Sequence, residues 1–478
     1  MNKINDLEIE KIFKLAINSY QNKDYLTAKD FYKEILNKKP NHIGALNNIA
    51  TVFNDLNDIP SAIICYKKII KIEPSFFNAY YNLGNILFSM KDFIKAKDYY
   101  KKATNINPNS VDAQFNLGVA YKKLEDNAKA ISCYKKVIEI NPNYVQAHNN
   151  LGVSFKALGI SNKAINCYEK AIDIDPNYVD AYNNLGVIYH ILEENYKAKK
   201  YFEKAIKIDP SFTHAYWNLQ SCSSNLDESL SVLQKLYKID NTYINAKIMI
   251  GALQGYKGNF DEFNSILASP HSQNPYARSV KWVFSLPKLP KLFFNRIDFF
   301  DAVIELTEKR RPFYEFGVWN GISFKHLIKT FKKGYGFDTF TGIPEAWHNE
   351  PKGNYSSFGA IPKIEGGKFI VGKFEDTLED FFSEKRPIAS LINFDADLYS
   401  STLCALNNSD KVIDEKTILI FDEFIINDKW EEDEYKALNE FCNNRGYSYE
   451  VIAVSFVTKQ AAVKINKKIN DYKKRLLN

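Results

Sequence analysis

The sequence predicts a two-part protein, an all-α solenoid of helical repeats followed by an α/β Rossmann-like domain. Two observations carry this prediction. In the first half, residue types recur every 34 positions. After residue 298, short apolar runs alternate with amphipathic stretches and glycine turns. We therefore expect a solenoid over residues 8–270, a connector over 271–297 and the α/β domain over 298–478.

The first half contains a strict 34-residue period. It is carried by prolines, by two sets of alanines and by an aromatic residue four positions after each alanine of one set. The prolines are Pro40, Pro74, Pro108, Pro142, Pro176 and Pro210; the aromatics are Tyr32, Tyr66, Tyr100, Tyr134, Tyr168 and Phe202. Within one unit, Ala45, Ile49 and Phe53 share one helix face, and the proline stands where a helix must stop.

This pattern resembles the tetratricopeptide repeat, a helix–turn–helix unit of 34 residues. We count about six regular units and one or two degenerate ones, the last being marked by Ala246, Gly251 and Gly258. No unit buries its apolar face alone, so the units are expected to stack into a solenoid with a concave surface. The resemblance implies a protein or peptide partner bound in the groove.

An asparagine recurs at one phase of the repeat although asparagine is a mediocre helix former. Two interpretations stay open: a tolerated polar helix face, or an amide ladder in the groove that binds an extended peptide backbone. The second arrangement resembles the asparagine ladder of O-linked N-acetylglucosamine transferases. The candidate peptide-binding residues are Asn48, Asn82, Asn116, Asn150, Asn184 and Asn218.

The α/β domain is predicted from seven apolar runs with helical segments between most of them. Alternation of this kind indicates a mostly parallel sheet with helices on both faces. The acidic run 428–434 is interpreted as a solvated helix face. The expected strands are 313–318, 334–338, 368–372, 390–395, 417–422, 449–454 and 461–465.

A ligand-binding turn is expected at the first strand-to-helix junction, Glu315-Phe-Gly317-Val-Trp-Asn-Gly321-Ile-Ser323. The two glycines let the backbone approach a ligand and expose helix N-terminal amides. Asp338 ends the next strand, where a carboxylate can accept both hydroxyls of a ribose. These features indicate a nucleoside site and fit a dinucleotide equally well.

Four carboxylates follow two further strands: Asp395 and Asp397 after one, Asp422 and Glu423 after the next. Parallel strands bring their carboxyl ends to one edge, where these groups would repel each other. A divalent cation is the economical explanation, and a site of oxygen ligands points to Mg²⁺ or a similar ion.

These motifs, with 337–347, 372–378, 394–402 and 420–424, resemble class I S-adenosylmethionine-dependent methyltransferases, and most closely the macrocin-type sugar O-methyltransferases. The resemblance covers about residues 310–465. It implies that Asp395, Asp422 and Glu423 hold the metal and that Asp397 is a general base. Two aspartates are usual where this chain has Asp422-Glu423. The implied cofactor-binding residues are Glu315, Gly317, Gly321, Ser323, Asp338 and Thr339.

The expected function is a metal-assisted O-methyltransferase that acts on a sugar hydroxyl and uses the solenoid to bind a partner. A scaffold with a vestigial methyltransferase-like domain and a protein methyltransferase are the alternatives. The net charge of +6 and the absence of a dense Lys/Arg block argue against nucleic acid. With no apolar signal-peptide core and no long uncharged apolar run, a cytoplasmic protein without a membrane span is expected.

Overall fold

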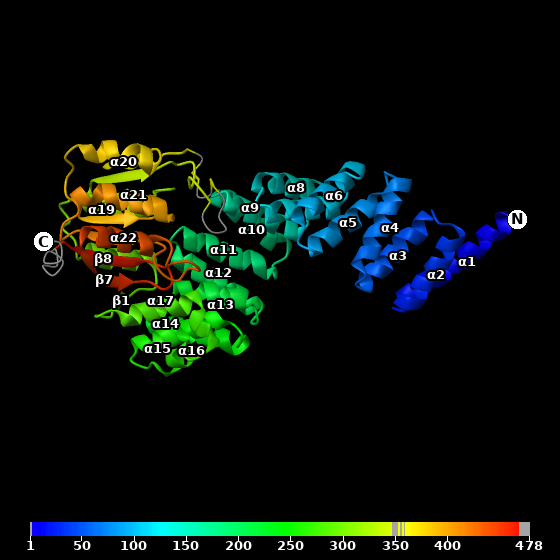
Figure 1. The fold of residues 1–478 in the computed structure, drawn as a ribbon, viewed down its shortest axis with the longest axis horizontal. Helices are drawn as coiled ribbons and strands as arrows, with labels where there is room; N and C mark the ends of the chain where they lie inside the picture. The colour runs from blue at the N-terminus through cyan, green and yellow to red at the C-terminus, as the bar shows by residue number, and fades with distance from the viewer. Residues whose placement is uncertain (1, 347–351, 354–355, 358, 468–478) are drawn as a thin grey trace. The chain divides into compact units, whose positions relative to one another are not determined.

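The computed structural model describes residues 2–346, 352–353, 356–357 and 359–467 (Figure 1). The chain divides into two compact units, residues 1–176 and 177–478, and each is described by itself. No helix among the described residues is long and apolar enough to cross a membrane.

The first unit is a stack of antiparallel helix pairs, as the 34-residue period predicts. The repeated alanines are fully buried where the two helices of a pair meet, and the repeated tyrosines are buried beside them. Gly84, Gly118 and Gly152 each leave room for the tyrosine ring of the same repeat, which a β-carbon would overlap. The helices are α1 (Asn2–Gln21), α2 (Tyr25–Lys38), α3 (Ile43–Asp55), α4 (Ile59–Ile72), α5 (Phe77–Ser89), α6 (Phe93–Ile106), α7 (Val111–Lys123), α8 (Asn127–Ile140), α9 (Val145–Ala157) and α10 (Ser161–Ile174).

The turn inside each of the six regular repeats has the same backbone conformation. One residue of every turn adopts the left-handed conformation, with φ between 59° and 70°, and these residues are again 34 positions apart. They are Lys23, Asn57, Lys91, Glu125, Gly159 and Glu193. The first five are exposed, whereas Glu193, in the second unit, is largely buried.

The second unit begins with the sixth repeat, and the helical array continues beyond it; α13, η1 and α16 are shorter than the other helices of the array. The helices of this part are α11 (Val179–Ile191), α12 (Asn195–Ile208), α13 (Thr213–Leu219), the 3-10 helix η1 (Gln220–Cys222), α14 (Leu226–Ile239), α15 (Ile244–Tyr256) and α16 (Asp261–Leu267).

The predicted connector 271–297 contains ordered elements rather than an extended linker. After the 3-10 helix η2 (Pro270–Gln273), helix α17 (Pro275–Ser285) packs Trp282 against Phe424, Trp430 and Tyr435. Pro270 and Pro275 begin these two helices, because the first helical position needs no N–H donor.

A mixed sheet forms the centre of the second unit. Within the described residues eight strands lie in the order β1-β7-β8-β6-β5-β2-β3-β4, and only β8 runs antiparallel to its neighbours. All seven predicted strands are present; the two-residue β1 was not predicted. The strands are β1 (Lys291–Leu292), β2 (Phe313–Phe316), β3 (Gly334–Asp338), β4 (Gly367–Val371), β5 (Leu391–Phe394), β6 (Ile418–Phe421), β7 (Ser448–Val454) and β8 (Ala461–Asn466).

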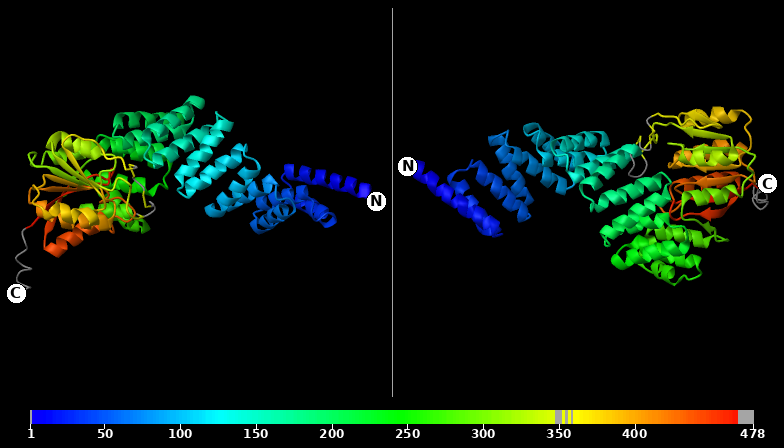
Figure 2. Two further views of the ribbon diagram at one scale, coloured as in Figure 1. Left: turned by 90° about the horizontal axis from the view of Figure 1, so that it is seen from above. Right: turned by 180° about the vertical axis from the view of Figure 1, so that it is seen from behind.

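Helices cover both faces of this sheet (Figures 1 and 2). Successive strand residues point to opposite faces. Phe313 therefore joins the core under α18 (Arg296–Ile304) and α19 (Ile322–Phe331). Tyr314 joins the core under α20 (Phe374–Ser383), α21 (Tyr399–Ser409) and α22 (Glu434–Arg445). Since helices cover both faces, a ligand can reach the sheet at the loops that follow the carboxyl ends of the strands.

Candidate functional site

A cavity of about 540 Å³ lies where the strand order of the sheet reverses. From the adjacent strands β2 and β5, the chain proceeds to β3 and β4 on one side and to β6 on the other. Loops that leave such a switch point diverge and open a crevice at the carboxyl edge, where ligands of α/β sheets bind. The volume is within the range of small-molecule sites. The cavity is lined by Gly317 and its loop, by Asp338, by the loops that follow β5 and β6, and by the sixth repeat.

The loop after β2 has the strained, close-packed backbone that its glycines predict. Gly317 has φ of 87°, and a β-carbon there would overlap the carbonyl oxygen of Asp395. Asp338 fixes this loop, since its Oδ2 accepts the backbone N–H groups of Val318 and Trp319, both at 2.7 Å. Gly321 has φ of 75° and precedes helix α19.

Glu315, the last acid before this loop, is completely buried. The Ser323 hydroxyl and the Asn393 amide donate to its Oε1, whereas Oε2 has no partner among the described residues. Burial raises the pKa of Glu315 to about 8, since an ionised carboxylate loses its hydration there. The side chain is therefore a largely neutral acid at pH 7.

The structure brings most of the predicted cofactor residues together. Gly317, Ser323, Asp338 and Thr339 line the cavity. Glu315 and Gly321 do not line it: the first supports the loop from beneath through Ser323, and the second caps helix α19. The Thr339 hydroxyl donates to the carbonyl of Gly342 at 2.9 Å and so closes the adjacent turn.

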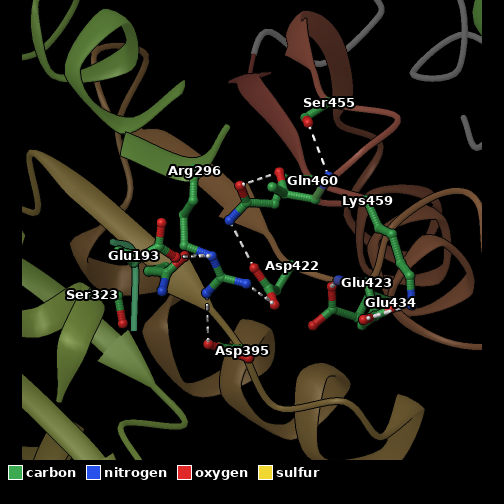
Figure 3. Close-up of polar contacts among 12 residues, drawn as sticks. Glu193, Arg296, Ser323, Asp395, Asp422, Glu423, Glu434, Ser455, Lys459 and Gln460 are labelled. Carbon is green, nitrogen blue, oxygen red and sulfur yellow. Dashed lines mark hydrogen bonds and ion pairs between the residues drawn. The ribbon is translucent and has the colours of Figure 1, made fainter. Parts of the chain in front are cut away.

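The four predicted carboxylates Asp395, Asp397, Asp422 and Glu423 also line the cavity, and two basic side chains pair with three of them. Arg296 donates to Oδ2 of Asp422 at 2.9 Å, and its Nη1 lies 3.7 Å from Oδ2 of Asp395 (Figure 3). Lys459 donates to both oxygens of Glu423, at 3.1 and 3.0 Å. The expectation of a cation rested on uncompensated repulsion. Arg296 and Lys459 compensate part of it, while burial and neighbouring carboxylates still raise the pKa of Asp395 and of Asp397.

The donor set does not fit a divalent cation. The second oxygen of Asp422 accepts from the amide of Gln460 at 2.7 Å, so both of its oxygens hold protein donors. Both oxygens of Glu423 hold Lys459. Among the described side chains, no group of three or more His, Cys, Asp or Glu residues is arranged to hold a metal ion.

Asp397 is the carboxylate of this group with the most unusual backbone. Its φ is 58°, a conformation that L-residues rarely adopt and that recurs at functional sites. Burial and the neighbouring charge of Glu423 raise the pKa of Asp397 well above its ordinary range. A carboxylate with an elevated pKa on a cavity wall is suited to accept a proton.

Several residues of the site were not predicted from the sequence. His190 and Glu193 of the sixth repeat line the cavity, as do Arg296 and Lys459. Nδ1 of His190 lies 2.8 Å from Oδ1 of Asn195, and burial lowers the pKa of the imidazole, which favours its neutral form. No local motif marks these residues, because only the packing of the repeats on the α/β domain brings them to the cavity.

The acidic run 428–434, interpreted as a solvated helix face, is solvated only in part: Asp428, Glu431 and Glu432 are exposed and precede the helix, whereas Glu434 is not exposed. Glu434 is the first residue of α22 and is fully buried, and its Oε2 accepts the backbone N–H of Glu423 at 3.2 Å. Burial among the other carboxylates raises its pKa well above the ordinary range.

The repeated asparagines are half-buried and take part in the packing of the repeats. Asn48 donates to the hydroxyl of Tyr32 at 3.2 Å, and Asn82 donates to that of Tyr66 at 3.1 Å. Asn116 and Asn218 instead donate to Oδ1 of a residue in the preceding repeat, at 3.2 and 2.9 Å. The tyrosine contacts give two of these amides a structural role, and each amide retains further hydrogen-bonding capacity for a peptide.

Comparison with known proteins identifies the repeats. Models described as "TPR repeat" and "Tetratricopeptide repeat" match consecutive segments between residues 50 and 212. A search of curated proteins found no match.

Three solved structures illustrate the similarity. The TPR protein YrrB, with "an unusual peptide-binding site", is 26% identical over 38% of this chain and 95% of its own (TM-score 0.36). MamA protein is 28% identical over 35% and 92% (0.34). A tetratricopeptide repeat protein from Parabacteroides merdae ATCC 43184 is 16% identical over 52% and 98% (0.42). The matches to these family models show that residues 50–212 form a tetratricopeptide-repeat array. Repeats of this type bind protein or peptide partners.

Proposed function

We propose that the chain is an S-adenosylmethionine-dependent O-methyltransferase whose repeat array binds the molecule that carries the acceptor. One observation carries the proposal: a glycine loop at the switch point of the sheet is held over the cavity by Asp338. This is the position and loop chemistry expected of a nucleoside-binding site in an α/β sheet.

The residues of the cavity fit the proposed cofactor. Gly317 lines the cavity, with the backbone of Asp395 filling the position of its missing β-carbon, and Asp338 and Thr339 line the same wall, where a ribose could be bound. Glu315 retains a buried oxygen without a partner in the described part of the chain, a position from which an ordered water could be held. Gly317, Ser323, Asp338 and Thr339 would hold the cofactor, supported by Glu315 and Gly321.

When bound, S-adenosylmethionine supplies a sulfonium methyl group already activated for transfer, and it leaves as the neutral thioether. The chain then has to align an acceptor oxygen and remove its proton. Asp397 would accept that proton, since it lines the cavity and its pKa is raised. No step is assigned to a metal ion, because the carboxylates already hold Arg296, Gln460 and Lys459.

A sugar hydroxyl attached to a polypeptide is the acceptor that best suits both the cavity and the repeat array. Carboxylates, Arg296 and Lys459 together offer the hydrogen-bond acceptors and donors that a sugar requires. His190 and Glu193 of the sixth repeat line the same cavity, which also favours a side chain of a bound protein as a second candidate acceptor.

Calorimetric titration of the full chain with S-adenosylhomocysteine tests the proposal, and NADH and ATP serve as comparators. We expect micromolar affinity for S-adenosylhomocysteine and none for the comparators. Binding of NADH alone would assign the site to a dinucleotide enzyme. No binding of any of the three would leave the chain as a repeat scaffold.

A further inference from the structure

Arg296, the first residue of helix α18, is a cation in the wall of the acidic cavity. It contacts three acids from three different elements: Asp422 after β6 at 2.9 Å, Asp395 after β5 at 3.7 Å and Glu193 of the sixth repeat at 3.5 Å (Figure 3). Three quarters of its side chain is buried. Its position is therefore fixed by ion pairs from both sides.

This guanidinium lies between the carboxylates that a divalent cation would have to bridge. A cation entering there would displace Arg296 from Asp422 and would place its charge beside the guanidinium, which stays protonated at all accessible pH values. Arg296 also borders the cavity and carries five N–H donors, more than its three acid contacts require.

Glu193 connects the repeat array to the cavity, because it forms an ion pair with Arg296. It occupies the left-handed position of the turn between α11 and α12, a backbone conformation that each of the six regular repeats has. At the equivalent positions Lys23, Asn57, Lys91, Glu125 and Gly159 are exposed, whereas the side chain of Glu193 is 16% exposed and directed at Arg296. The repeat thus contributes a buried charge to a site in the α/β domain.

We infer that Arg296, oriented by Glu193 of the sixth repeat, is the resident cation of this site and takes the place of a divalent metal ion. The role of Arg296 in methyl transfer rests on the proposed function. The claim that a guanidinium occupies the cation position rests only on the contacts of the described side chains. Arg296 and Glu193 are accordingly positioning residues.

Titration with Mn²⁺ monitored by electron paramagnetic resonance tests this claim without any assay of activity. The wild-type chain and Arg296→Lys, which keeps a cation, are expected to bind no Mn²⁺ at millimolar concentration. Arg296→Gln exposes Asp395 and Asp422 to each other and is expected to gain one bound Mn²⁺, which Asp395→Asn in that background removes. One Mn²⁺ bound by the wild-type chain and lost in Asp395→Asn would overturn the inference even if Arg296→Gln fails to fold. A folded Arg296→Gln that binds none would overturn it as well.

The contribution of the repeat is tested by Glu193→Gln, with Glu125→Gln as the matched control at an exposed turn of the same conformation. All five tryptophans lie in residues 177–478, so their fluorescence reports on this unit alone. Glu193→Gln is expected to lower the midpoint of the tryptophan transition by several degrees. Glu125→Gln, which lies in the first unit, is expected to leave the helical transition followed by circular dichroism unchanged. A tryptophan midpoint in Glu193→Gln equal to that of the wild-type chain would contradict the role of Glu193. S-adenosylhomocysteine titrated into the same samples tests the proposed function separately, because its failure to bind leaves the Mn²⁺ and unfolding results standing.

Discussion

Gly317 approaches Asp395 so closely that a β-carbon on the glycine would overlap the carbonyl oxygen of the aspartate. The two residues follow the neighbouring strands β2 and β5, whose register aligns Phe316 with Phe394. The contact therefore holds together the two loops that diverge at the switch point. It explains why the first position after β2 has to be a glycine.

Gly317→Ala is expected to abolish the binding of S-adenosylhomocysteine and to lower the free energy of unfolding by about 3 kcal/mol or more. The left-handed φ costs about 1–2 kcal/mol for alanine, and displacement of the packed backbone adds to this. Urea unfolding followed by tryptophan fluorescence measures the change. Gly258→Ala is the matched control, since Gly258 has φ of 88° and nothing near its missing β-carbon, so that variant should lose only about 1 kcal/mol. Equal losses in the two variants would contradict the steric explanation.

Glu315 should make this unit less stable as the pH rises. Its pKa in the folded chain is about 8, above the 4.5 of an unperturbed glutamate, so the folded state keeps a proton that the unfolded chain has lost. Stability from this group is complete below pH 4.5 and is lost as the pH rises toward 8, at up to about 1.4 kcal/mol per pH unit.

Glu315→Gln removes this proton linkage while preserving the hydrogen-bonding shape of the neutral acid. Urea unfolding at pH 5, 6, 7 and 8 should therefore show a shallower decline for the variant than for the wild-type chain. Parallel pH profiles would show that Glu315 is ionised in the folded state.

Asp397→Asn should suppress methyl transfer without weakening cofactor binding. A general base of this kind contributes about 10²–10⁴-fold to rate, and asparagine tolerates the left-handed backbone of this position. Release of S-adenosylhomocysteine in the presence of glycopeptide acceptors measures the rate, and calorimetry of S-adenosylhomocysteine is the control. Because the pKa of Asp397 is raised, its carboxylate forms only at higher pH, so wild-type turnover should increase with pH. Undiminished turnover in Asp397→Asn would remove its assignment as the base.

Asn48→Ala should destabilise the first repeats by about 1 kcal/mol, because it removes the amide that donates to the buried hydroxyl of Tyr32. In a Tyr32→Phe background the same change should cost less, since the hydroxyl is already gone. Circular dichroism follows the unfolding of these helices. Identical costs in both backgrounds would mean that Asn48 does not support Tyr32 and would leave the amide to peptide binding alone.

The repeat array was predictable from the sequence because each helix pair is built from contacts within one or two 34-residue periods. The 34-residue spacing marks Ala45, Ala62 and Tyr66 as core positions, and all three are buried in the structure. The strands of the α/β domain were predictable for a similar reason, since each is a short apolar run flanked by turns. Strand β1, only two residues long, carries too little pattern to be recognised.

The candidate site was predictable only in part. Gly317, Asp338, Asp395 and Asp422 follow strands, so sheet topology alone brings them together. Arg296 comes from the segment before the first long strand and contacts Asp422 across 126 positions of sequence, a pairing that no local pattern specifies. The Mg²⁺ site was predicted from the carboxylates alone. Arg296 and Lys459, which pair with three of them in the folded chain, could not be foreseen from the sequence.

The number of repeats in the first unit can vary independently of the residues that line the cavity. Every described residue that lines the cavity lies between His190 and Lys459, and the sixth repeat supplies the first of them. Whole units of 34 residues could be gained or lost before residue 176 without replacing any of these residues. The number of repeats before residue 176, and with it the length of the solenoid, can therefore change while the cavity keeps its lining residues.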